Sequence, residues 1–384
     1  MDKNTLMKLR IGVTGQAGFV GYHLYQTLAL KEAITLVPFK RSFFEDTQGM
    51  AAFVKQCDVI VHLAAMNRHD DPQVIYDTNV NLVSRLVSAC ENEKVSPHIL
   101  FSSSSQESKD NLYGKSKKMG KQLFIDWANR SDGTFTSLTI PNVFGPFGKP
   151  NYNSVVATFC HKIARNEAPT IMNDSEVGLI YINDLVAHFI SVIQDKAKTK
   201  NIAHHSFELT IEPNTYVKVS HILNLLTQYK EDYMGNGIFP SLEDAFEKAL
   251  FNTFRCYAPQ EHYPVKLTKH TDDRGSFVEI ARTETSGQFS FSTTVPGITR
   301  GNHYHTRKAE RFAVISGKAL IQLRKIGTDE VIDYYLDGKE PAYVDMPIWY
   351  THNIKNIGDE ELITLFWINE PYNPKNADTY FENV

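Results

Sequence analysis

The chain has 384 residues, of which 42% are hydrophobic and 22% charged, a composition typical of a soluble globular protein long enough for two domains. A formal net charge of -4 at pH 7, with no long run of lysine or arginine, argues against nucleic-acid binding. The longest apolar runs, such as Val59–Met66, are too short to span a membrane, and the N-terminus lacks an apolar signal core. The four cysteines form no CxxC pair, so we expect reduced thiols and a cytoplasmic protein.

A strand, a glycine-rich turn and a helix are predicted at the start of the chain. Leu9–Thr14 is an apolar, β-prone run that leads into a turn with glycines at Gly15, Gly18 and Gly21. In such a turn the first glycine permits a tight bend, the second lets the backbone approach a pyrophosphate, and the third lets helix and strand pack closely. The amides at the helix N-terminus attract the same anion. The pattern predicts a dinucleotide site that also includes Gln16, Phe19 and Val20.

The second strand, predicted over Ile34–Phe39, indicates which dinucleotide binds. An acidic residue at the end of this strand would bind the ribose 2′-hydroxyl of NAD, but Lys40 and Arg41 stand there instead. A basic pair favours the 2′-phosphate of NADP, so we predict NADPH as the cofactor. The alternative is that the two residues form an ordinary exposed basic pair.

Further strands and a long helix continue an alternating α/β pattern. We predict strands over residues 58–65, 98–104 and 134–140, and a helix over residues 112–129. The first of these strands runs into Leu63, Ala64 and Ala65, where the cofactor would lie. Tyr113 and Lys117 stand four residues apart on the helix, so they share one face and the ammonium can approach the phenol.

These motifs together resemble the extended short-chain dehydrogenase/reductase family. The resemblance implies a Rossmann-like, doubly wound parallel sheet within residues 1–256, with Tyr113 as the general acid. It also implies that Ser104, or less favourably Ser103, steadies the substrate carbonyl, and that Lys117 binds the nicotinamide ribose. A nearby cation makes physical sense, because a phenol with a pKa of about 10 is a poor proton donor to substrate near neutral pH until that pKa is lowered.

Departures from the family pattern narrow the function. Sugar-nucleotide dehydratases of this family carry an acidic pair just after the catalytic serine or threonine, but Ser105 and Gln106 stand here, so dehydration is not expected. Pro141 replaces the more usual arginine in the loop on the substrate side. The candidate substrate-binding residues around this loop are Asn142, Lys149, Asn151 and Tyr152, although a plain polar loop is equally compatible with the sequence.

The later part of the chain divides at a break in the pattern. Before the break we predict a strand over Ile180–Asp184 and helices over residues 205–255. Two prolines interrupt the pattern between Tyr257 and Pro264, so the domain boundary is placed there, with a second domain over residues 262–384. Alternating strands with glycine turns then predict an all-β barrel.

A candidate metal site lies in this second domain. His303 and His305 stand two residues apart, so both imidazoles project from the same face of a strand, and Glu310 follows after a short turn. With His352 as a fourth ligand, three imidazoles and a carboxylate suit a divalent transition metal with an open coordination position.

The spacing of these ligands between Gly297 and Gly317 resembles the first motif of the cupin family, small β-barrels with a metal or sugar site. The second cupin motif is only partly present, since Trp349 replaces its usual glycine. Thr271–Ile280 and the segment around His303 resemble cupins that epimerise deoxysugar nucleotides at C3 and C5. In the metal-free enzymes of that kind the matching histidine is a base, so His303 is either a ligand, which we favour, or a base. The other candidates for a catalytic role in this domain are Lys308, Tyr304 and Tyr350.

Nearly the whole chain resembles a family of bifunctional enzymes of capsular polysaccharide synthesis. The resemblance implies a UDP-2-acetamido-2,6-dideoxy-4-hexulose as substrate, inverted at C3 by the cupin domain and reduced at C4 with NADPH by the N-terminal domain. The product would be UDP-2-acetamido-2,6-dideoxy-L-talose, on the route to N-acetyl-L-fucosamine in surface polysaccharide. A homodimer with zinc in the cupin domain is also implied. Two alternatives stay open: a 3,4-ketoisomerase in place of the epimerase, and a non-enzymatic sensor of NADP and sugar.

Overall fold

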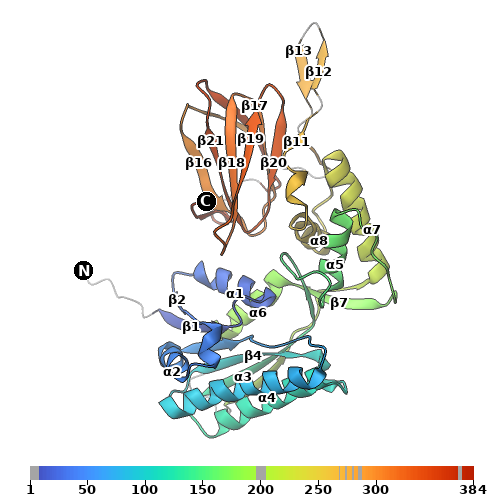
Figure 1. Ribbon diagram of the computed structural model, residues 1–384. Coiled ribbons are helices and arrows are strands. Elements are labelled where there is room, and N and C mark those ends of the chain that lie inside the picture. The colour runs from blue at the N-terminus through green and yellow to red at the C-terminus, as the bar shows by residue number, and fades with distance from the viewer. Residues whose placement is uncertain are drawn as a thin grey trace, which may run out of the picture. The chain divides into compact units, whose positions relative to one another are not determined.

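The structure is a computed structural model that describes residues 8–195, 205–267, 269–272, 275–278, 281–283, 288–370 and 374–384. Contacts between residues divide the chain into two compact units, Met1–Phe144 with Glu176–Val217, and Gly145–Ser175 with Lys218–Val384. Figure 1 shows a helix-covered sheet in the first unit and antiparallel strands in the second. Within the described ranges, no helix is long and apolar enough to cross a membrane. The predicted domains, 1–256 and 262–384, stay a prediction.

The first unit contains a six-stranded parallel sheet with the strand order β2-β1-β3-β4-β5-β8. Its strands are β1 (Leu9–Thr14), β2 (Ile34–Val37), β3 (Val59–His62), β4 (His98–Ser104), β5 (Thr134–Ile140) and β8 (Ser206–Thr210). The strand order reverses at β1 and β3, which is where doubly wound sheets bind their ligands. The predicted Rossmann-like parallel sheet is confirmed.

Helices cover both faces of this sheet because its central strands are apolar on both faces. β3 is buried at every position, as expected for a strand between two helical layers. One face packs against α2 (Thr47–Gln56), α3 (Pro72–Glu93) and α4 (Leu112–Asn129). The other face packs against α1 (Phe19–Ala29) and α6 (Ile182–Asp195), as Figure 1 shows.

The strands predicted over Ile34–Phe39 and residues 58–65 are shorter in the structure, where β2 ends at Val37 and β3 spans Val59–His62. Two further predictions differ in the kind of element. The strand predicted over Ile180–Asp184 is wrong in its second half, because β7 spans Glu176–Tyr181 and α6 begins at Ile182. Buried residues at 182, 185, 186 and 189 recur at helical spacing, which favours the helix. The helices predicted over 205–255 are wrong for residues 206–210 and 215–218, which form β8 and β9 (Thr215–Lys218). β8 pairs with the edge of β5, a long-range contact that overrides local propensity.

Helices also form the first part of the second unit. They are α5 (Val155–Ala164), α7 (Val219–Tyr229), a π-helical turn over Lys230–Gly235, and α8 (Ala245–Arg255). The side chain of Ser154 caps α5 and that of Asp244 caps α8, each by accepting a hydrogen bond from a first-turn amide. A small sheet of β6 (Asn142–Phe144), β7 and β9 lies mainly in the first unit.

Two five-stranded antiparallel sheets make up most of the second unit, with the orders β11-β20-β17-β22-β15 and β19-β18-β21-β16-β23. The strands are β11 (Val265–Lys266), β15 (Gln288–Thr294), β16 (Thr299–Tyr304), β17 (Glu310–Ser316), β18 (Lys318–Lys325), β19 (Val331–Asp337), β20 (Ala342–Met346), β21 (Tyr350–Asn356), β22 (Leu362–Ile368) and β23 (Tyr380–Phe381). Alternate residues such as Ala319, Ile321 and Leu323 of β18 face a shared apolar core. The predicted all-β architecture is confirmed.

Short two-stranded ladders complete the second unit. They are β12 (Lys269–Asp272) with β13 (Gly275–Val278), and β10 (Ile238–Phe239) with β14 (Arg282–Thr283). The predicted epimerase-like segment Thr271–Ile280 overlaps the first ladder. Four of its residues, Asp273, Arg274, Glu279 and Ile280, lie outside the described residues.

The four cysteines are free thiols, as predicted, and Cys57, Cys90 and Cys160 are buried. Burial raises the pKa of Cys57 and of Cys90 to about 12, so neither forms a reactive thiolate near neutral pH. Their role is therefore packing within the first unit's core, where both belong to the same apolar cluster.

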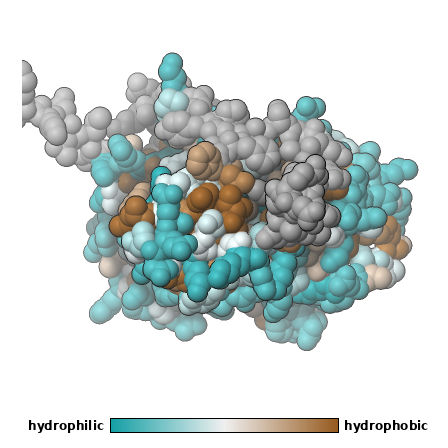
Figure 2. Space-filling view, turned by 90° about the horizontal axis from the view of Figure 1, so that it is seen from above, coloured by the Kyte–Doolittle hydropathy of each residue, from teal (hydrophilic) through white to brown (hydrophobic). Residues whose placement is uncertain are grey.

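Some apolar side chains of the second unit reach the surface near the turns between strands. Val295 and Ile298 lie between β15 and β16, and Ile357 follows β21; they are 59%, 49% and 42% exposed. Figure 2 shows apolar side chains gathered among hydrophilic ones on the face seen from above. Exposed apolar residues in such numbers are ordinary on protein surfaces and need no bound partner.

A buried ion pair joins β17 to β20. Arg311 donates from Nε to Asp345 Oδ1 at 2.7 Å and from Nη2 to Oδ2 at 3.0 Å, and both side chains are 1% exposed. Tyr233 of the π-helical turn also donates to Asp345, and Arg255 at the end of α8 donates to the Met346 carbonyl at 2.8 Å. The same polar network therefore holds these helical segments against the antiparallel sheet of the second unit.

Removing one partner of the pair should destabilise the second unit strongly. In Asp345→Ala the guanidinium of Arg311 stays buried without its carboxylate, which costs about 3–5 kcal/mol. As a matched control, Glu340→Ala removes an exposed pair with Lys266, which contributes about 0–1 kcal/mol. The check is the thermal unfolding midpoint of each variant, and equal midpoints would contradict the assignment.

The pH dependence of this contribution has a definite sign. Burial raises the pKa of Asp345, but the Arg311 guanidinium, together with Arg255 and the Tyr233 hydroxyl, outweighs burial and holds that pKa below its ordinary value. A lowered folded-state pKa means that the pair stabilises the fold at neutral pH and loses that contribution as pH falls through the lowered value. The difference in unfolding midpoint between wild type and Asp345→Ala should therefore narrow in acid.

Candidate functional site

The glycine turn after β1 is held by close backbone contacts. Gly15 has a φ of +74°, and a Cβ there would lie 2.7 Å from the amide nitrogen of Ala64. A Cβ on Gly21 would lie 2.1 Å from the Gly15 carbonyl oxygen, so neither position admits a side chain. No side chain in the described part of the chain caps α1, which begins after Gly18. Its N-terminal amides therefore suit a phosphate.

The other predicted cofactor residues surround this turn in the first unit. Gln16 donates from Nε2 to the Phe39 carbonyl at 2.9 Å, while its Oε1 is buried without a hydrogen-bond partner among the described residues. Lys40 and Arg41 are exposed just beyond β2, which ends at Val37. The remaining members are half-buried on α1 or after β3: Phe19, Val20, Leu63, Ala64 and Ala65.

The predicted catalytic tyrosine and lysine lie together on α4. The Lys117 ammonium is 5.9 Å from the centroid of the Tyr113 ring, and it donates to the Ser102 carbonyl at 2.9 Å. Lys117 is 4% exposed, and this burial lowers its pKa to about 8. Ser104, at the end of β4, accepts a hydrogen bond from the Gln106 amide at 3.2 Å. The arrangement puts a buried cation next to a phenol.

A carboxylate that sequence reasoning missed lies at the end of β4. Ser103 donates to Glu107, which pairs with Lys121 at 2.7 Å, and Lys121 also pairs with Glu208 of β8 at 2.9 Å. The charge of Glu107 partly offsets the effect of burial on the pKa of Lys117. One signal in the sequence pointed to a carboxylate here: Lys121 stands four residues after Lys117 and shares its helix face, and two neighbouring lysines favour a nearby acidic partner.

The predicted substrate residues are divided between the two units. Asn142 lies on β6 in the first unit, is exposed, and donates to the Gly178 carbonyl at 3.3 Å. The other three lie on one loop of the second unit: the Lys149 ammonium is 5.2 Å from the centroid of the Tyr152 ring. Asn151 has a φ of +54°, and its backbone N–H donates to the Thr158 hydroxyl at 3.0 Å.

The four predicted metal ligands lie together in the second unit. One ligand atom from each of His303, His305, Glu310 and His352 lies within 4.8 Å of the others. His303 on β16 pairs across strands with His352 on β21, whereas Glu310 comes from β17 in the other sheet. A bulge between Gly301 and His303, with Asn302 at a φ of +59°, shifts the register that aligns the two histidines.

Three ligand atoms of this cluster are buried and face one another, an arrangement that suits a metal site. Nε2 of His305 and of His352 lie 3.0 Å and 3.2 Å from Oε2 of Glu310. All three atoms are buried, and among the described residues they have no hydrogen-bond partner outside these mutual contacts. The opposite ring nitrogens, Nδ1, face the carbonyls of Asp378 and Tyr350, which fixes the tautomer that leaves each Nε2 with a lone pair.

Electrostatics of the cluster also fit a divalent cation. Burial raises the pKa of Glu310, but the imidazoles of His305 and His352 outweigh it and hold that pKa well below its ordinary range. Burial lowers the pKa of His303 to about 4. Burial also lowers the pKa of His305, but the Glu310 carboxylate outweighs burial and raises that pKa above its ordinary value, so a metal would displace a proton there. A charged carboxylate and a neutral imidazole are the forms that bind a metal, and three nitrogens with one oxygen suit zinc.

Trp349 occupies the position where the cupin motif usually has glycine. Its φ is +61°, so this tryptophan adopts the left-handed conformation that a glycine would supply. Its amide donates to the His305 carbonyl at 2.8 Å, and its ring stacks on Tyr304 at 5.7 Å. Although tryptophan replaces glycine, the backbone next to the ligands therefore still has the left-handed conformation.

The other candidate catalytic residues of this unit have different surroundings. Lys308 is buried and its ammonium donates to the Ala377 carbonyl. Tyr304 is buried between two aromatic rings, with its ring centroid 5.7 Å from that of Trp349 and 5.4 Å from that of Tyr380. Tyr350 is half-buried, with its ring 6.2 Å from that of Phe147.

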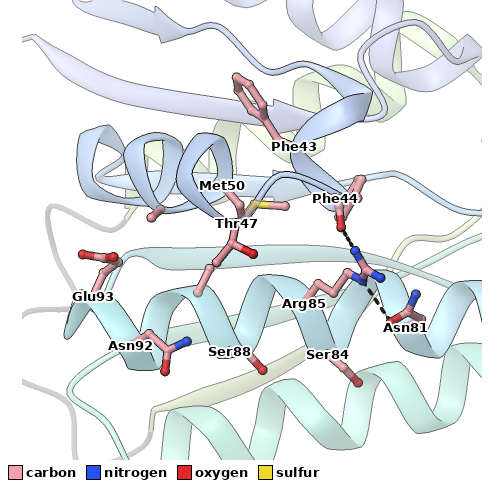
Figure 3. Close-up of a pocket in the computed structure, with 12 residues that line it drawn as sticks. Phe43, Phe44, Thr47, Met50, Asn81, Ser84, Arg85, Ser88, Asn92 and Glu93 are labelled. Atoms are coloured by element: carbon pink, nitrogen blue, oxygen red, sulfur yellow. Dashed lines mark hydrogen bonds between the residues drawn. The ribbon is translucent and has the colours of Figure 1, made fainter.

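A separate groove of about 530 Å³ lies between α2 and α3, as Figure 3 shows. Arg85 projects into it from α3, donating to the Asn81 side chain at 3.2 Å and to the Phe44 carbonyl. Its polar lining recurs along α3 at Ser84, Ser88 and Asn92. None of the predicted site residues lines this groove.

Known proteins match the chain over nearly its whole length. Residues 11–204 match the NAD dependent epimerase/dehydratase family, and residues 270–380 match the polysaccharide biosynthesis C-terminal domain. The chain is 33% identical over 380 residues to a UDP-2-acetamido-2,6-beta-L-arabino-hexul-4-ose reductase from Pseudomonas aeruginosa, covering 97% of this chain and 98% of that protein.

Two further relatives extend the comparison. The solved structure of the capsular polysaccharide assembling protein CapF from Staphylococcus aureus is 37% identical, with a TM-score of 0.60, covering 97% of this chain and 100% of CapF. The spore coat polysaccharide biosynthesis protein SpsL from Bacillus subtilis is 29% identical over 123 residues, which are 29% of this chain and 82% of SpsL.

The fold and the glycine turn define the class, a nicotinamide-dependent enzyme with an all-β C-terminal part. The chain belongs to the NAD dependent epimerase/dehydratase family. Within that family it is similar to CapF over nearly the full length of both chains, which confirms the predicted resemblance to bifunctional enzymes of capsular polysaccharide synthesis.

Filling the glycine turn should weaken cofactor binding strongly. In Gly21→Ala the new methyl group would meet the Gly15 carbonyl at 2.1 Å, so helix and turn must separate and the phosphate cradle is lost. We expect the dissociation constant for the reduced nicotinamide nucleotide to rise by roughly a hundredfold, measured by nucleotide fluorescence. Gly235→Ala is the control, because the nearest atom to its Cβ is 3.7 Å away. Tight binding by Gly21→Ala would show that the nucleotide lies elsewhere.

Proposed function

We propose that this chain is a bifunctional nucleotide-sugar enzyme. Its cupin domain epimerises C3 of a UDP-2-acetamido-2,6-dideoxy-4-hexulose, and its N-terminal domain reduces the C4 ketone to give UDP-2-acetamido-2,6-dideoxy-L-talose. The observation that carries the proposal is the presence in one chain of the Tyr113–Lys117 pair and the His/Glu cluster. The name of one full-length relative, a hexul-4-ose reductase, supports the same substrate class, and that of CapF, a capsular polysaccharide assembling protein, supports a role in capsule synthesis. A role in O-antigen synthesis is the other form of the same proposal.

Reduction at C4 requires a proton for the oxygen as the carbon gains a hydride. Bound NADPH supplies that hydride. The Tyr113 phenol donates the proton, and the Lys117 ammonium stabilises the phenolate that remains. The Ser104 hydroxyl, with Ser103 next to it, hydrogen-bonds the carbonyl and holds it toward the phenol. Burial lowers the pKa of Lys117 to about 8, so the ammonium keeps its charge only at a pH below that value. Reduction should therefore slow as the pH rises beyond it.

Inversion at C3 requires a base, because the adjacent C4 ketone makes the C3 proton acidic. His303, His305, Glu310 and His352 are the residues that would hold a zinc ion. A zinc ion held by these residues would supply positive charge that favours enolisation of the ketone. The candidates for the base are Lys308 and Tyr350, and also His303 if it is not a ligand. We further propose that the protein is a cytoplasmic homodimer.

The basic pair after β2 should set the cofactor preference. Arg41→Ala removes a charge that would contact the 2′-phosphate, so the Michaelis constant for NADPH should rise on the order of tenfold, with little change for NADH. Steady-state kinetics with both nucleotides check this, with Lys118→Ala on the exposed face of α4 as the control. An equal change in the Michaelis constants for NADPH and NADH would contradict the role of Arg41 in binding the 2′-phosphate.

The two half-reactions should separate by mutation. Tyr113→Phe should lower NADPH oxidation on the order of a hundredfold or more, since it removes a positioned acid, while deuterium exchange from D2O into C3 continues. His305→Ala should stop exchange at C3, lower zinc content and leave the N-terminal domain able to reduce the unepimerised ketone. Product NMR follows both positions and also distinguishes C3 epimerisation from 3,4-ketoisomerisation. Loss of exchange in a folded Tyr113→Phe protein would assign the inversion to the N-terminal site instead.

A further inference from the structure

A loop that begins at a predicted metal ligand is held by a segment near the C-terminus. The loop is residues 305–308, and the segment is residues 376–378. Three loop side chains donate to consecutive carbonyls of the segment: Arg307 to Asn376 at 3.1 Å, Lys308 to Ala377, and His305, through Nδ1, to Asp378. A carbonyl only accepts, so Nδ1 of His305 carries the proton in this contact.

The side chain of Asp378 completes the contact in the opposite direction. Its carboxylate is fully buried and accepts from the amides of Thr306, Arg307 and Lys308 at 3.2, 3.0 and 3.2 Å, and from the Thr306 hydroxyl at 2.6 Å. Successive amides that converge on one anion form a nest, which is a strong and directional anion site. The backbone of the loop is thus folded around this one carboxylate.

Both ends of the loop matter to the His/Glu cluster. The loop begins at His305, and Glu310 follows two residues after it ends. With Nδ1 bound to the Asp378 carbonyl, Nε2 of His305 is turned to within 3.0 Å of Glu310. The backbone of Asp378 has a φ of +46°, a conformation that Asp and Asn tolerate better than most residues. These contacts between residues 305–308 and residues 376–378, which we call the clasp, therefore fix both the tautomer and the direction of one imidazole.

We propose that Asp378 is a positioning residue for the metal centre: its carboxylate locks the 305–308 loop so that His305 presents Nε2 to the ion. The inference rests on the proposed metal site and goes beyond it, because Asp378 itself is not a ligand. A residue with a purely structural role would weaken the metal-free and metal-bound forms equally. A positioning residue weakens metal binding itself, and outer contacts of this kind commonly change affinity by about 10- to 100-fold.

The test measures Zn²⁺ affinity of the full-length protein by competition with a chromophoric chelator, and unfolding midpoints with and without Zn²⁺. Asp378→Asn keeps a residue that tolerates the left-handed backbone, but it removes the charge and turns an NH₂ group toward the loop amides. Its dissociation constant for Zn²⁺ should rise about 10- to 100-fold, and the gain in midpoint on adding Zn²⁺ should shrink. Glu382→Gln is the matched control, since this nearby carboxylate pairs with Arg324 at 2.9 Å outside the clasp.

Each outcome decides between the alternatives. Wild-type affinity in a folded Asp378→Asn protein overturns the positioning role. If that variant does not fold, Thr306→Val removes only the hydroxyl donor: a severalfold rise in the dissociation constant supports the inference, and no change overturns it. A wild-type chain that binds no Zn²⁺ overturns the metal centre, and the clasp's role with it, before any substitution is compared.

Discussion

The convergence of Glu310 with imidazoles is the constraint on which the second unit depends. Its carboxylate lies buried within 3.0 Å of one imidazole and 3.2 Å of another. A buried carboxylate is costly unless positive charge or hydrogen bonds offset the loss of water. β17 brings Glu310 from one sheet while β16 and β21 bring histidines from the other, so the cluster exists only when both sheets are in register. An ion bound there would therefore stabilise the whole arrangement of sheets.

The site of the first unit depends on a different constraint: its backbone must come close to an anion. Gly15 and Gly21 leave no room for a side chain, and the closeness of turn, α1 and β3 follows from that. Positive charge stands at the edges of the site, on the exposed Lys40 and Arg41 after β2 and on the buried Lys117 of α4. The nucleotide site is therefore encoded mostly in three local glycines, whereas the His/Glu cluster is encoded in contacts between distant strands.

This difference explains what the sequence could predict. β1, β4, β5 and α4 have the predicted limits because each is a local pattern with a clear start, such as the Asn111 side chain that caps α4. The ligand spacing was equally local, apart from His352. The pairing of β8 with β5, the Glu107–Lys121 pair and the Asp378 clasp were missed, because contacts of this kind join segments whose residue types alone do not indicate the partner.

Trp349 shows why a motif is better interpreted as a backbone conformation than as a residue. A left-handed conformation at a non-glycine residue costs about 1–2 kcal/mol. Trp349 is 1% exposed, and burying an aromatic side chain of roughly 150–250 Å² at about 25 cal/mol per Å² contributes more than that cost. Trp349 stands three residues before His352, and its backbone amide still donates to the His305 carbonyl. Loss of the motif glycine therefore does not imply loss of the ligand geometry, because the same turn is stabilised by packing instead of by conformational freedom.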